Sequence, residues 1–469
     1  MPTPIDPHIF RAYDIRGKAL TQLTADACEQ IGRGFGSVLQ ELYAQGKKDY
    51  HPAVIVGRDA RTHSPELEAA LIKGLAEAGC AVQKIGQTPS PVNYFNICTR
   101  KTDAGVQITA SHNPKEDNGI KLQIRSAESH SGDDLQKLRE RIEAQKFFSG
   151  TGSEEEIDGI NPYMEYLVKL FGDIGKGKKI VVDAGNGVAG PVNVGVLRRV
   201  GCEVIELYTD PDGTFPNHPA DPSKYSTLKD LQAKVIEQQV LCGFAYDGDG
   251  DRMGLVDERG QICTADQVLL LLAQDHLKRH AGKPVVFTVS NSGTLESEVS
   301  KWGGKPLMSK VGHSFVEHAM HENGALLGGE QSGHFFCGEG YFGFDDALVA
   351  SLHVLKILAD GSDALSSRIA GFPKVYQAHE MRPYCADDKK KDVVAKVTAH
   401  FQASHPVITL DGARIDFGDG AWAGIRFSNT SPCLSVCIEA RSAEKLAAVE
   451  KEVVEHLKTY AEVDFERGH

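Results

Sequence analysis

Residues 53–86, AVIVGRDARTHSPELEAALIKGLAEAGCAVQKIG, contain the pattern that indicates the fold class. A short apolar run, AVIVGRD, is followed by a loop, by the helix-period segment SPELEAALIKGLAEAG that ends at Gly79, and by a second apolar run, AVQKIG. A strand, a helix with a glycine stop and another strand form a βαβ unit with parallel strands. The stretch therefore predicts an α/β domain.

The same order of elements occurs twice more along the chain. KKIVVDAGNG precedes PVNVGVLRRVG and CEVIELY, and KPVVFTVSNSG precedes TLESEVSKWGG and KPLMSKVGH. After about residue 372, alternating apolar residues in VITLDGARIDFGDGAWAGIRFSNTSPCLSVCIEA lie between two helical patterns, which is typical of antiparallel strands. We therefore predict three similar α/β domains and a C-terminal α+β domain, with bounds at residues 1–157, 158–259, 260–372 and 373–469.

Composition limits the class of protein. The chain of 469 residues is too long for one core, and its 41% hydrophobic and 25% charged residues are ordinary for a folded protein. A net charge of −13 argues against nucleic acid or an anionic membrane as the main partner. The N-terminus lacks a signal-peptide pattern, and no apolar run approaches the ~18 residues of a membrane span. We expect a cytoplasmic protein whose ten scattered cysteines are reduced core residues.

The first stretch with chemical character is QITASHNPKEDNGIKL, residues 107–122. It places Ser111 after an apolar strand, at the strand end where α/β sheets bind their ligands. His112 follows directly, and Lys121 lies near the end of the stretch. The alternative is an ordinary polar turn, because Ser, Asn and Pro all favour turns.

The second stretch is YDGDGDRMG, residues 246–254, in which Asp247, Asp249 and Asp251 alternate with glycines. Carboxylates at this spacing can converge on one hard cation, and without it they would repel one another. An EF-hand is an alternative, since Glu258 falls at its last loop position, but Arg252 replaces its turn glycine and a strand precedes the loop. A solvated acidic turn is the other alternative.

The third stretch is GGEQSGH, residues 328–334. Glu330, Ser332 and His334 lie on a glycine-rich loop, and a carboxylate beside a hydroxyl suits a polyhydroxylated ligand. A polar hairpin is the alternative. The pattern therefore indicates a sugar-binding loop.

The fourth stretch is RFSNTSP, residues 426–432. Arg426 offers a forked cation, and Ser428, Asn429 and Thr430 add short donors in a turn. This chemistry suits a phosphate, although the spacing differs from a P-loop.

Six motifs, FRAYDIRG, TASHNP, DGDGDR, GEQSGH, GFDD and RFSNTSP, occur in this order between residues 10 and 432. With them the chain resembles the α-D-phosphohexomutases, most closely the bacterial phosphomannomutase/phosphoglucomutase group. The resemblance implies a heart-shaped assembly of four domains around a deep cleft. It also implies reversible transfer of phosphate between the 1- and 6-positions of glucose and mannose phosphates. A hexose 1,6-bisphosphate would be the intermediate, and glucose 1,6-bisphosphate the activator.

The resemblance also implies roles for individual residues. Ser111 would be a phosphoserine that completes a site for one Mg²⁺ per chain with Asp247, Asp249 and Asp251. Cationic side chains would offset the phosphate charge, and these are Arg16, Lys121 and Arg252. The candidates for proton transfer are His112, Lys121 and His334. The substrate-binding residues would be Tyr13, Lys310, His313, Glu330, Ser332, His334, Arg426, Ser428, Asn429 and Thr430.

Two positions depart from the group. Gln331 stands where the group usually has Met, so that GEQSGH is more similar to the phosphoglucosamine mutases, but the GTDGIRG and RPSGTEP motifs of those enzymes are missing. Ser290 stands where close relatives tend to have a lysine. If Glu330 and Ser332 read the 3- and 4-hydroxyls, which glucose and mannose share, both hexoses should be substrates.

Several alternatives to the mutase stay open on sequence alone. A phosphoglucosamine mutase, a sugar-phosphate phosphatase and a non-catalytic sugar-phosphate sensor would use related loops. We expect small hexose phosphates as the partners, no nucleic acid or membrane, and a monomer. Because the bisphosphate must turn around, we also expect the fourth domain to swing about a hinge near residue 372.

Overall fold

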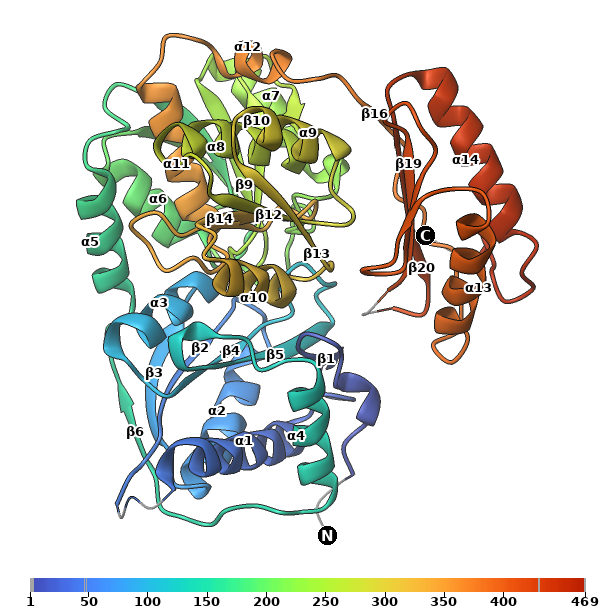
Figure 1. The fold of residues 1–469 in the computed structure, drawn as a ribbon. Coiled ribbons are helices and arrows are strands. Elements are labelled where there is room, and N and C mark those ends of the chain that lie inside the picture. The colour runs from blue at the N-terminus through green and yellow to red at the C-terminus, as the bar shows by residue number, and fades with distance from the viewer. Residues whose placement is uncertain (1–3, 46, 48, 429–430, 468–469) are drawn as a thin grey trace. The chain divides into compact units, whose positions relative to one another are not determined.

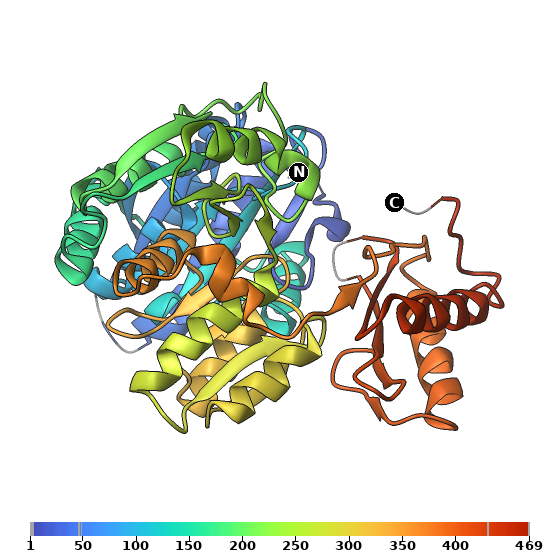
Figure 2. The ribbon, with the colours of Figure 1, turned by 90° about the horizontal axis from the view of Figure 1, so that it is seen from above.

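The computed structural model describes residues 4–45, 47, 49–428 and 431–467 (Figures 1 and 2). By contact density the chain forms two compact units. The first consists of residues 1–268 and 332–367, and the second of residues 269–331 and 368–469. In the described part of the chain, every helix is too short or too polar to cross a membrane.

The first sheet has six strands. They are β1 (Ile15–Lys18), β2 (Ala53–Arg58), β3 (Ala81–Gln87), β4 (Ala104–Ile108), β5 (Asp117–Ile124) and β6 (Ser153–Glu156). Their order is β1-β5-β4-β2-β3-β6, in which β5 is antiparallel to β1 and β4 while β2 is parallel to both β3 and β4. The parallel pairing of β2 and β3 confirms the βαβ unit predicted from residues 53–86.

Four helices pack around this sheet. They are α1 (Ala25–Leu39), α2 (Ser64–Glu77), α3 (Ser90–Arg100) and α4 (Asp133–Glu143). Apolar side chains of α1, α2 and α4 share one core with the sheet, including Phe35, Leu71 and Leu138. Helix α2 has Pro in its first turn, where the missing N–H of proline costs no hydrogen bond.

The second sheet also lies in the first unit and is mixed. Its strands are β7 (Lys179–Asp183), β8 (Glu203–Leu207), β9 (Cys242–Tyr246), β10 (Met253–Asp257) and β11 (Ile262–Cys263). The order is β11-β10-β9-β7-β8, with β7 parallel to β8 and β9 and with β10 antiparallel to β9. The other elements of this unit are α5 (Ile160–Phe171), α6 (Gly190–Arg199), α7 (Lys229–Gln238), β15 (Phe335–Cys337) and α11 (Ala347–Ala359).

The second unit begins with a parallel arrangement. Strands β12 (Pro284–Thr288), β13 (Lys305–Ser309) and β14 (Leu327–Gly329) are accompanied by α9 (Gly293–Lys301) and α10 (His313–Asn323). β12 is parallel to both β13 and β14, which confirms the third predicted βαβ unit. Two helices contain the points at which the chain passes from one unit to the other. They are α8 (Ala265–Arg279) and α12 (Leu365–Ala370).

The C-terminal sheet is antiparallel throughout. Its strands are β16 (Tyr376–Gln377), β17 (Val407–Ile408), β18 (Ala413–Asp416), β19 (Trp422–Phe427) and β20 (Leu434–Ala440). Helices α13 (Lys390–Gln402) and α14 (Ala443–Leu457) lie on one side of the sheet in both views (Figures 1 and 2). The predicted fold class, three α/β regions followed by an α+β region, is confirmed.

The remaining short helical turns are Pro7–Ile9, Gln40–Ala44, Arg125–Ala127 and Tyr225–Leu228. All ten cysteines lie in the described part of the chain as free thiols, and nine of them are buried, as predicted.

Candidate active site

Ser111 lies in a tight loop directly after β4. Strand β4 is buried at every residue and ends at Ile108, three residues before the serine. Ser111 has φ +51°, in the left-handed region that non-glycine residues rarely occupy. Its backbone N–H donates to Thr109 Oγ1 at 2.9 Å, and only 1% of the residue is exposed. The serine is thus held in a costly conformation by its surroundings.

A buried arginine supports this loop through hydrogen bonds to its backbone. Arg61 is fully buried, and its guanidinium donates to the carbonyl oxygens of Ser111 (2.9 Å) and Asn113 (2.7 Å). It donates further to two carbonyls at the loop's end, those of Pro114 (2.7 Å) and Asp117 (3.0 Å). One side chain therefore fixes the path of the entire serine loop.

Asp59 holds Arg61 in place. Its carboxylate accepts from Arg61 Nε at 3.0 Å and from Thr109 Oγ1 at 2.8 Å, and the ring of Phe215 lies over the guanidinium at 5.3 Å. Neither charged residue was predicted to belong to the site, because GRDAR is typical of the end of a strand. The available signal was a pair of opposite charges directly after a buried strand.

The acidic loop between β9 and β10 faces the serine. Ser111 Oγ donates to Asp247 Oδ2 at 2.6 Å, and Asp247, Asp249 and Asp251 are each at most 1% exposed. Oxygen atoms of these three carboxylates lie within 4.8 Å of one another. The backbone of the loop is bent around Asp247 Oδ1, which accepts three N–H groups.

Lys121 on β5 enters the same cluster. Its ammonium donates to Asp249 Oδ2 at 2.7 Å and also to Asp251. Burial alone would lower the pKa of Lys121, but these two carboxylates raise it well above the usual value. Lys121 is therefore a fixed positive charge. By contrast, burial and the charges of Asp251 and Asp249 raise the pKa of Asp247 well above its usual range.

The donor set fits a divalent metal ion. Asp249 Oδ1 is buried and has no hydrogen-bond donor among the described residues. Hard cations such as Mg²⁺ prefer carboxylate oxygens, and a cation here would relieve the repulsion that raises the pKa of Asp247. The preceding β9 is a strand, so the helix that an EF-hand requires is not there. The predicted metal-binding character of the loop agrees with this geometry.

Arg252 and His334 lie at the edge of the acidic cluster. Arg252 Nε donates to His334 Nε2 at 3.2 Å and lies 4.0 Å from Asp247 Oδ2. The other ring nitrogen of His334 lies 3.0 Å from Ser332 Oγ. Behind His334, burial and the charge of Asp251 raise the pKa of Asp345 to about 7. Asp345 belongs to the GFDD motif, and no role was predicted for it individually.

Arg16 and His112 complete the surroundings of the serine. Arg16 Nη1 donates to Ala110 O at 3.0 Å and to Asn113 Oδ1 at 2.9 Å, while its Nε pairs with Asp14. His112 Nδ1 lies 3.2 Å from Ser111 Oγ. Burial and the nearby charges of Arg252 and Arg16 lower the pKa of His112 well below its usual value, so its ring is neutral at pH 7. Tyr13 is half-buried just before β1.

The second unit contains three of the predicted sugar residues, Lys310, His313 and Glu330. Glu330 is 3% exposed, and its Oε1 accepts from Gly312 N at 2.7 Å. This bond brings Glu330 next to the turn between Lys310, which is exposed, and His313, which begins α10. The three predicted residues therefore come together within this unit.

The predicted phosphate loop follows β19. Within the described residues, the buried Arg426 Nε has no hydrogen-bond acceptor, so it is available for an anion. Ser428 Oγ accepts from Ser431 N at 3.1 Å. Asn429 and Thr430 lie outside the described residues. Lys390, which the sequence analysis missed, donates to the carbonyl oxygens of Ser428 (2.6 Å) and Ser431 (3.2 Å) and so supports the loop.

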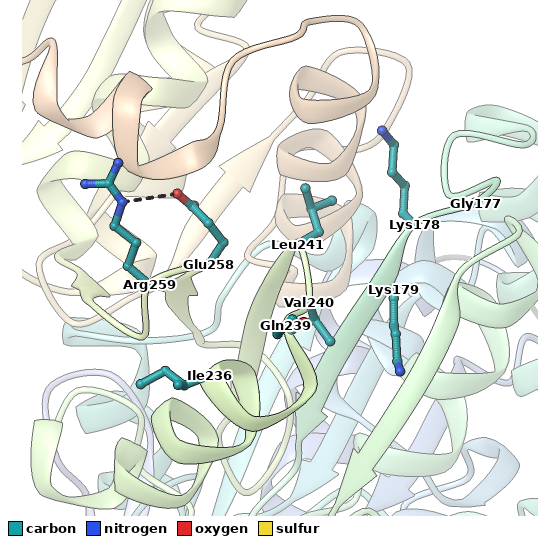
Figure 3. A pocket seen from close by; sticks show the side chains of 9 residues that line it. All are labelled: Gly177, Lys178, Lys179, Ile236, Gln239, Val240, Leu241, Glu258 and Arg259. Atoms are coloured by element: carbon teal, nitrogen blue, oxygen red, sulfur yellow. Dashed lines mark ion pairs between the residues drawn. The ribbon is translucent and has the colours of Figure 1, made fainter.

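A surface hollow of the first unit lies away from these groups (Figure 3). Arg259 and Glu258 form a pair at 3.7 Å on one side of it, and Lys178 lies on the other side. The residues that line it are Gly177, Lys178, Lys179, Ile236, Gln239, Val240, Leu241, Glu258 and Arg259. None of the predicted site residues is among them.

Known protein families match the chain along most of its length. The matching families are phosphoglucomutase/phosphomannomutase alpha/beta/alpha domains I, II and III and the C-terminal domain of the same enzymes. The matched segments are residues 7–149, 161–260, 264–376 and 380–456.

Individual relatives agree with the family matches. A phosphomannomutase/phosphoglucomutase of Pseudomonas aeruginosa is 40% identical over 444 residues, covering 94% of this chain and 93% of that protein. A phosphoglucomutase of Neisseria meningitidis is 37% identical and covers 94% of each chain. The crystal structure of a phosphoglucomutase/phosphomannomutase family protein from Burkholderia thailandensis superimposes with a TM-score of 0.88 at 38% identity, over 98% of this chain and 100% of that one.

Proposed function

Because the chain belongs to the phosphoglucomutase/phosphomannomutase family, we propose that it moves phosphate reversibly between the 1- and 6-positions of hexose phosphates. It is thus an isomerase of the hexose phosphate mutase class. The observation that carries the proposal is the hydroxyl of Ser111, which is held in a left-handed turn 2.6 Å from a buried acidic loop. Such a hydroxyl can accept a phosphoryl group and return it.

Mg²⁺ is the metal that this site would take. The ligands would be Asp247, Asp249 and Asp251 together with an oxygen of phosphorylated Ser111. When bound, it would offset the negative charge on the phosphoryl oxygens during transfer. Two observations support this assignment. Asp249 Oδ1 has no donor in the part of the chain that the structure describes, and repulsion from Asp251 and Asp249 adds to the burial that raises the pKa of Asp247.

The chain's own cations would orient the phosphate. Arg16 bonds the serine loop and pairs with Asp14, whereas Lys121 pairs with the acidic loop, and both side chains stay charged. A phosphoserine carries about −1.5 to −2 charge at pH 7, so these side chains favour the phosphorylated form. They also fix the direction from which a sugar hydroxyl can attack phosphorus.

Phosphoryl transfer also needs groups that donate and accept protons. As the bond from phosphorus to Ser111 Oγ breaks and the bond to a sugar oxygen forms, the serine oxygen must gain a proton and the sugar hydroxyl must lose one. His112 is neutral and 3.2 Å from Ser111 Oγ, so it can exchange a proton with that atom. Lys121 already carries its proton and so cannot take one from the sugar hydroxyl, which leaves His112 and His334 as the candidates for that role.

The substrate would be a glucose or mannose phosphate. Glu330 and Ser332 would bind the 3- and 4-hydroxyls, with Lys310, His313 and Tyr13 around the sugar. Gln331 is the residue that makes this loop similar to the phosphoglucosamine mutases. Its side-chain Oε1 lies 3.7 Å from Cys437 Sγ, so the amide contacts the protein. Because C2 is then read by none of these residues, we expect both hexoses to react with less than about a thousandfold difference in kcat/KM.

The phosphate away from the serine would be held by Arg426 and Ser428, with Asn429 and Thr430. Either end of glucose 1,6-bisphosphate must fit there, because this compound is the intermediate and the activator. Arg426 Nε has no hydrogen-bond acceptor among the described residues, and this supports its use for an anion.

The protein would act as a monomer with one metal ion. Its domains would comprise residues 1–157, 158–259, 260–372 and 373–469, and the family matches break close to these positions.

The test compares glucose 1-phosphate, mannose 1-phosphate and glucosamine 1-phosphate with Mg²⁺ and catalytic bisphosphate. Wild type should convert the first two at similar kcat/KM, and mass spectrometry should find phosphate on Ser111. Ser111→Ala should abolish both turnover and that modification. Release of inorganic phosphate in place of isomerisation would instead indicate a phosphatase, and a clear preference for glucosamine 1-phosphate would overturn the substrate assignment.

A further inference from the structure

The C-terminal sheet has one apolar face and one polar face. Residues Ala423, Ile425, Val436 and Ile438 belong to the core formed with α13 and α14. The cross-strand pairs Arg414 with Gly424, Trp422 with Glu439 and Arg426 with Ser435 put the alternate positions on the opposite face. The cation of the proposed phosphate site and a second arginine, Arg414, therefore share one polar surface.

Part of this polar face is buried although it is charged. Arg414 is 7% exposed, Trp422 is 6% exposed and Glu439 is fully buried. Arg414 lies over the Trp422 ring at 3.5 Å from its centre, and Trp422 Nε1 donates to Glu439 Oε1 at 3.1 Å. Charged side chains are rarely buried unless other groups satisfy them.

The remaining partners are backbone groups of the loop after β12. Arg414 Nη1 donates to the carbonyl oxygens of Val289 and Asn291, the latter at 2.9 Å. Gly293 N donates to Glu439 Oε1 at 3.0 Å. Arg414, Trp422 and Glu439, which we call the docking cluster, thus attach the C-terminal sheet to residues 289–293.

Two further contacts join the same parts of the second unit. Asp411 Oδ2 accepts from Val311 N at 3.0 Å, next to the Gly312 N–H that binds Glu330. Cys437 Sγ lies 3.7 Å from Gln331 Oε1, beside Glu330 in the sequence. The loops at residues 289–293, 310–313 and 330–331 therefore each contact the C-terminal sheet or the turn between β17 and β18.

The geometry along β19 links these contacts to the phosphate site. Trp422 begins β19 and Arg426 lies four residues further along the same face, about 13 Å away at the usual rise of a strand. A rigid strand held at Trp422 therefore fixes the position of Arg426 relative to the docked loops. If the docking contacts break, Arg426 moves away from Glu330 with the whole sheet.

We propose that the docking cluster is a positioning device that holds the phosphate-binding arginine in register with the sugar-binding loops and keeps the bisphosphate intermediate bound while it turns around. The inference rests on the proposed mutase function. The intermediate must leave Arg426 and rebind it with its other phosphate without leaving the protein. Hydrogen bonds to backbone groups suit this, because they are directional and hold Arg426 at one distance from the sugar-binding loops while the intermediate turns.

The first experiment measures docking without substrate. Hydrogen–deuterium exchange of the full chain is compared for wild type, Arg414→Met and Glu439→Gln, with Arg441→Met as a control on an exposed arginine of the same domain. Both docking variants should exchange the Gly293 amide about tenfold faster, whereas Arg441→Met should match wild type. Unchanged exchange at residues 289–293 in both docking variants would overturn the docking itself.

The second experiment measures what docking does for the reaction. Phosphorylated protein is mixed with glucose 1-phosphate, and free glucose 1,6-bisphosphate is counted per product formed. Arg414→Met should release the bisphosphate about tenfold more often and need correspondingly more activator, while the first phosphoryl transfer stays within about threefold of wild type. Trp422→Phe keeps an aromatic ring but loses the N–H that bonds Glu439, and it should show a smaller increase in bisphosphate release.

The outcomes separate this inference from the proposed function. Faster exchange with unchanged bisphosphate release would overturn the positioning role. An equal loss of both phosphoryl transfers would show a general structural defect and would also overturn it. If wild type shows no mutase turnover with any hexose phosphate, the proposed function fails, whereas the exchange experiment still decides whether the cluster docks.

Discussion

Replacing Arg61 by methionine should separate the support of the serine loop from the chemistry of the serine. Arg61 touches no atom of the acidic loop's carboxylates, but it binds four carbonyl oxygens of the loop that carries Ser111. Methionine fills a similar volume and removes the charge. We expect Arg61→Met to fold, to lose stability and to lose most of its mutase rate.

The magnitude follows from the contacts. Arg61 and Asp59 form an ion pair at 3.0 Å with both side chains at most 2% exposed, and removing one partner of such a buried pair costs about 3–5 kcal/mol. Four carbonyls also lose their donor, at about 1–3 kcal/mol each if water stayed out, so water must enter and the loop must relax. A shift of about 1 Å at Ser111 would lower the rate of phosphoryl transfer about a hundredfold.

The assay pairs chemical denaturation with the rate of phosphoryl transfer from phosphorylated protein to glucose 1-phosphate. Arg58→Met serves as the matched control, because Arg58 lies three residues away in a partly exposed pair with Glu68 at 3.1 Å. That control should lose about 0–1 kcal/mol and keep its rate. If Arg61→Met kept wild-type transfer while its stability fell as expected, the loop would not need this support and the reasoning would be wrong.

Three further predictions concern the metal, pH and specificity. In EDTA, Asp247→Asn should unfold at a higher temperature than wild type, because one repelling charge is gone, and it should lose the stabilisation that Mg²⁺ gives to wild type; equal stabilisation of both proteins by Mg²⁺ would contradict the metal site. Burial lowers the pKa of His130 in the fold, so the unfolded chain binds this proton first as the pH falls and stability decreases below about pH 6.5; His130→Gln should show a shallower loss between pH 7.5 and 5.5 by urea denaturation, and an identical slope would refute the assignment. Gln331→Met should change kcat/KM for glucosamine 1-phosphate relative to glucose 1-phosphate by less than about tenfold, because the Gln331 amide contacts Cys437; a larger change would show that this side chain reads the sugar.

The secondary structure was predictable where the sequence pattern is local. The strand runs around Val54, Val181 and Val286 are short and apolar, and each is followed by a helix-period segment, so the three βαβ units could be found without long-range information. The alternation from Ala413 to Ala440 likewise predicted the antiparallel strands. In each case one element's own residues decide its conformation.

The site was predictable only in part, because its residues meet from distant segments. The sequence identified Ser111 and the three aspartates from motifs, but it gave no sign that Arg61 would reach four carbonyls or that Lys390 would support the phosphate loop. Arginine and lysine at such places look like ordinary surface charges in a sequence. Their function depends on burial, which the fold as a whole determines.

The choice among the three proton-transfer candidates shows the same limit in chemical terms. His112, Lys121 and His334 were equivalent by sequence, since each is a titratable side chain in a polar loop or beside one. The carboxylate of Asp249, 128 residues away, pairs with the ammonium of Lys121 and raises its pKa. Lys121 therefore keeps its proton and cannot serve as a base. His112 loses its charge because it is buried beside two arginines, one of them 140 positions further along the chain, at Arg252. In another fold the same local motif could therefore place a charged histidine and a neutral lysine beside the serine. The neutral imidazole of His112, 3.2 Å from Ser111 Oγ, follows from the packing of the first unit rather than from the neighbouring residues in the sequence.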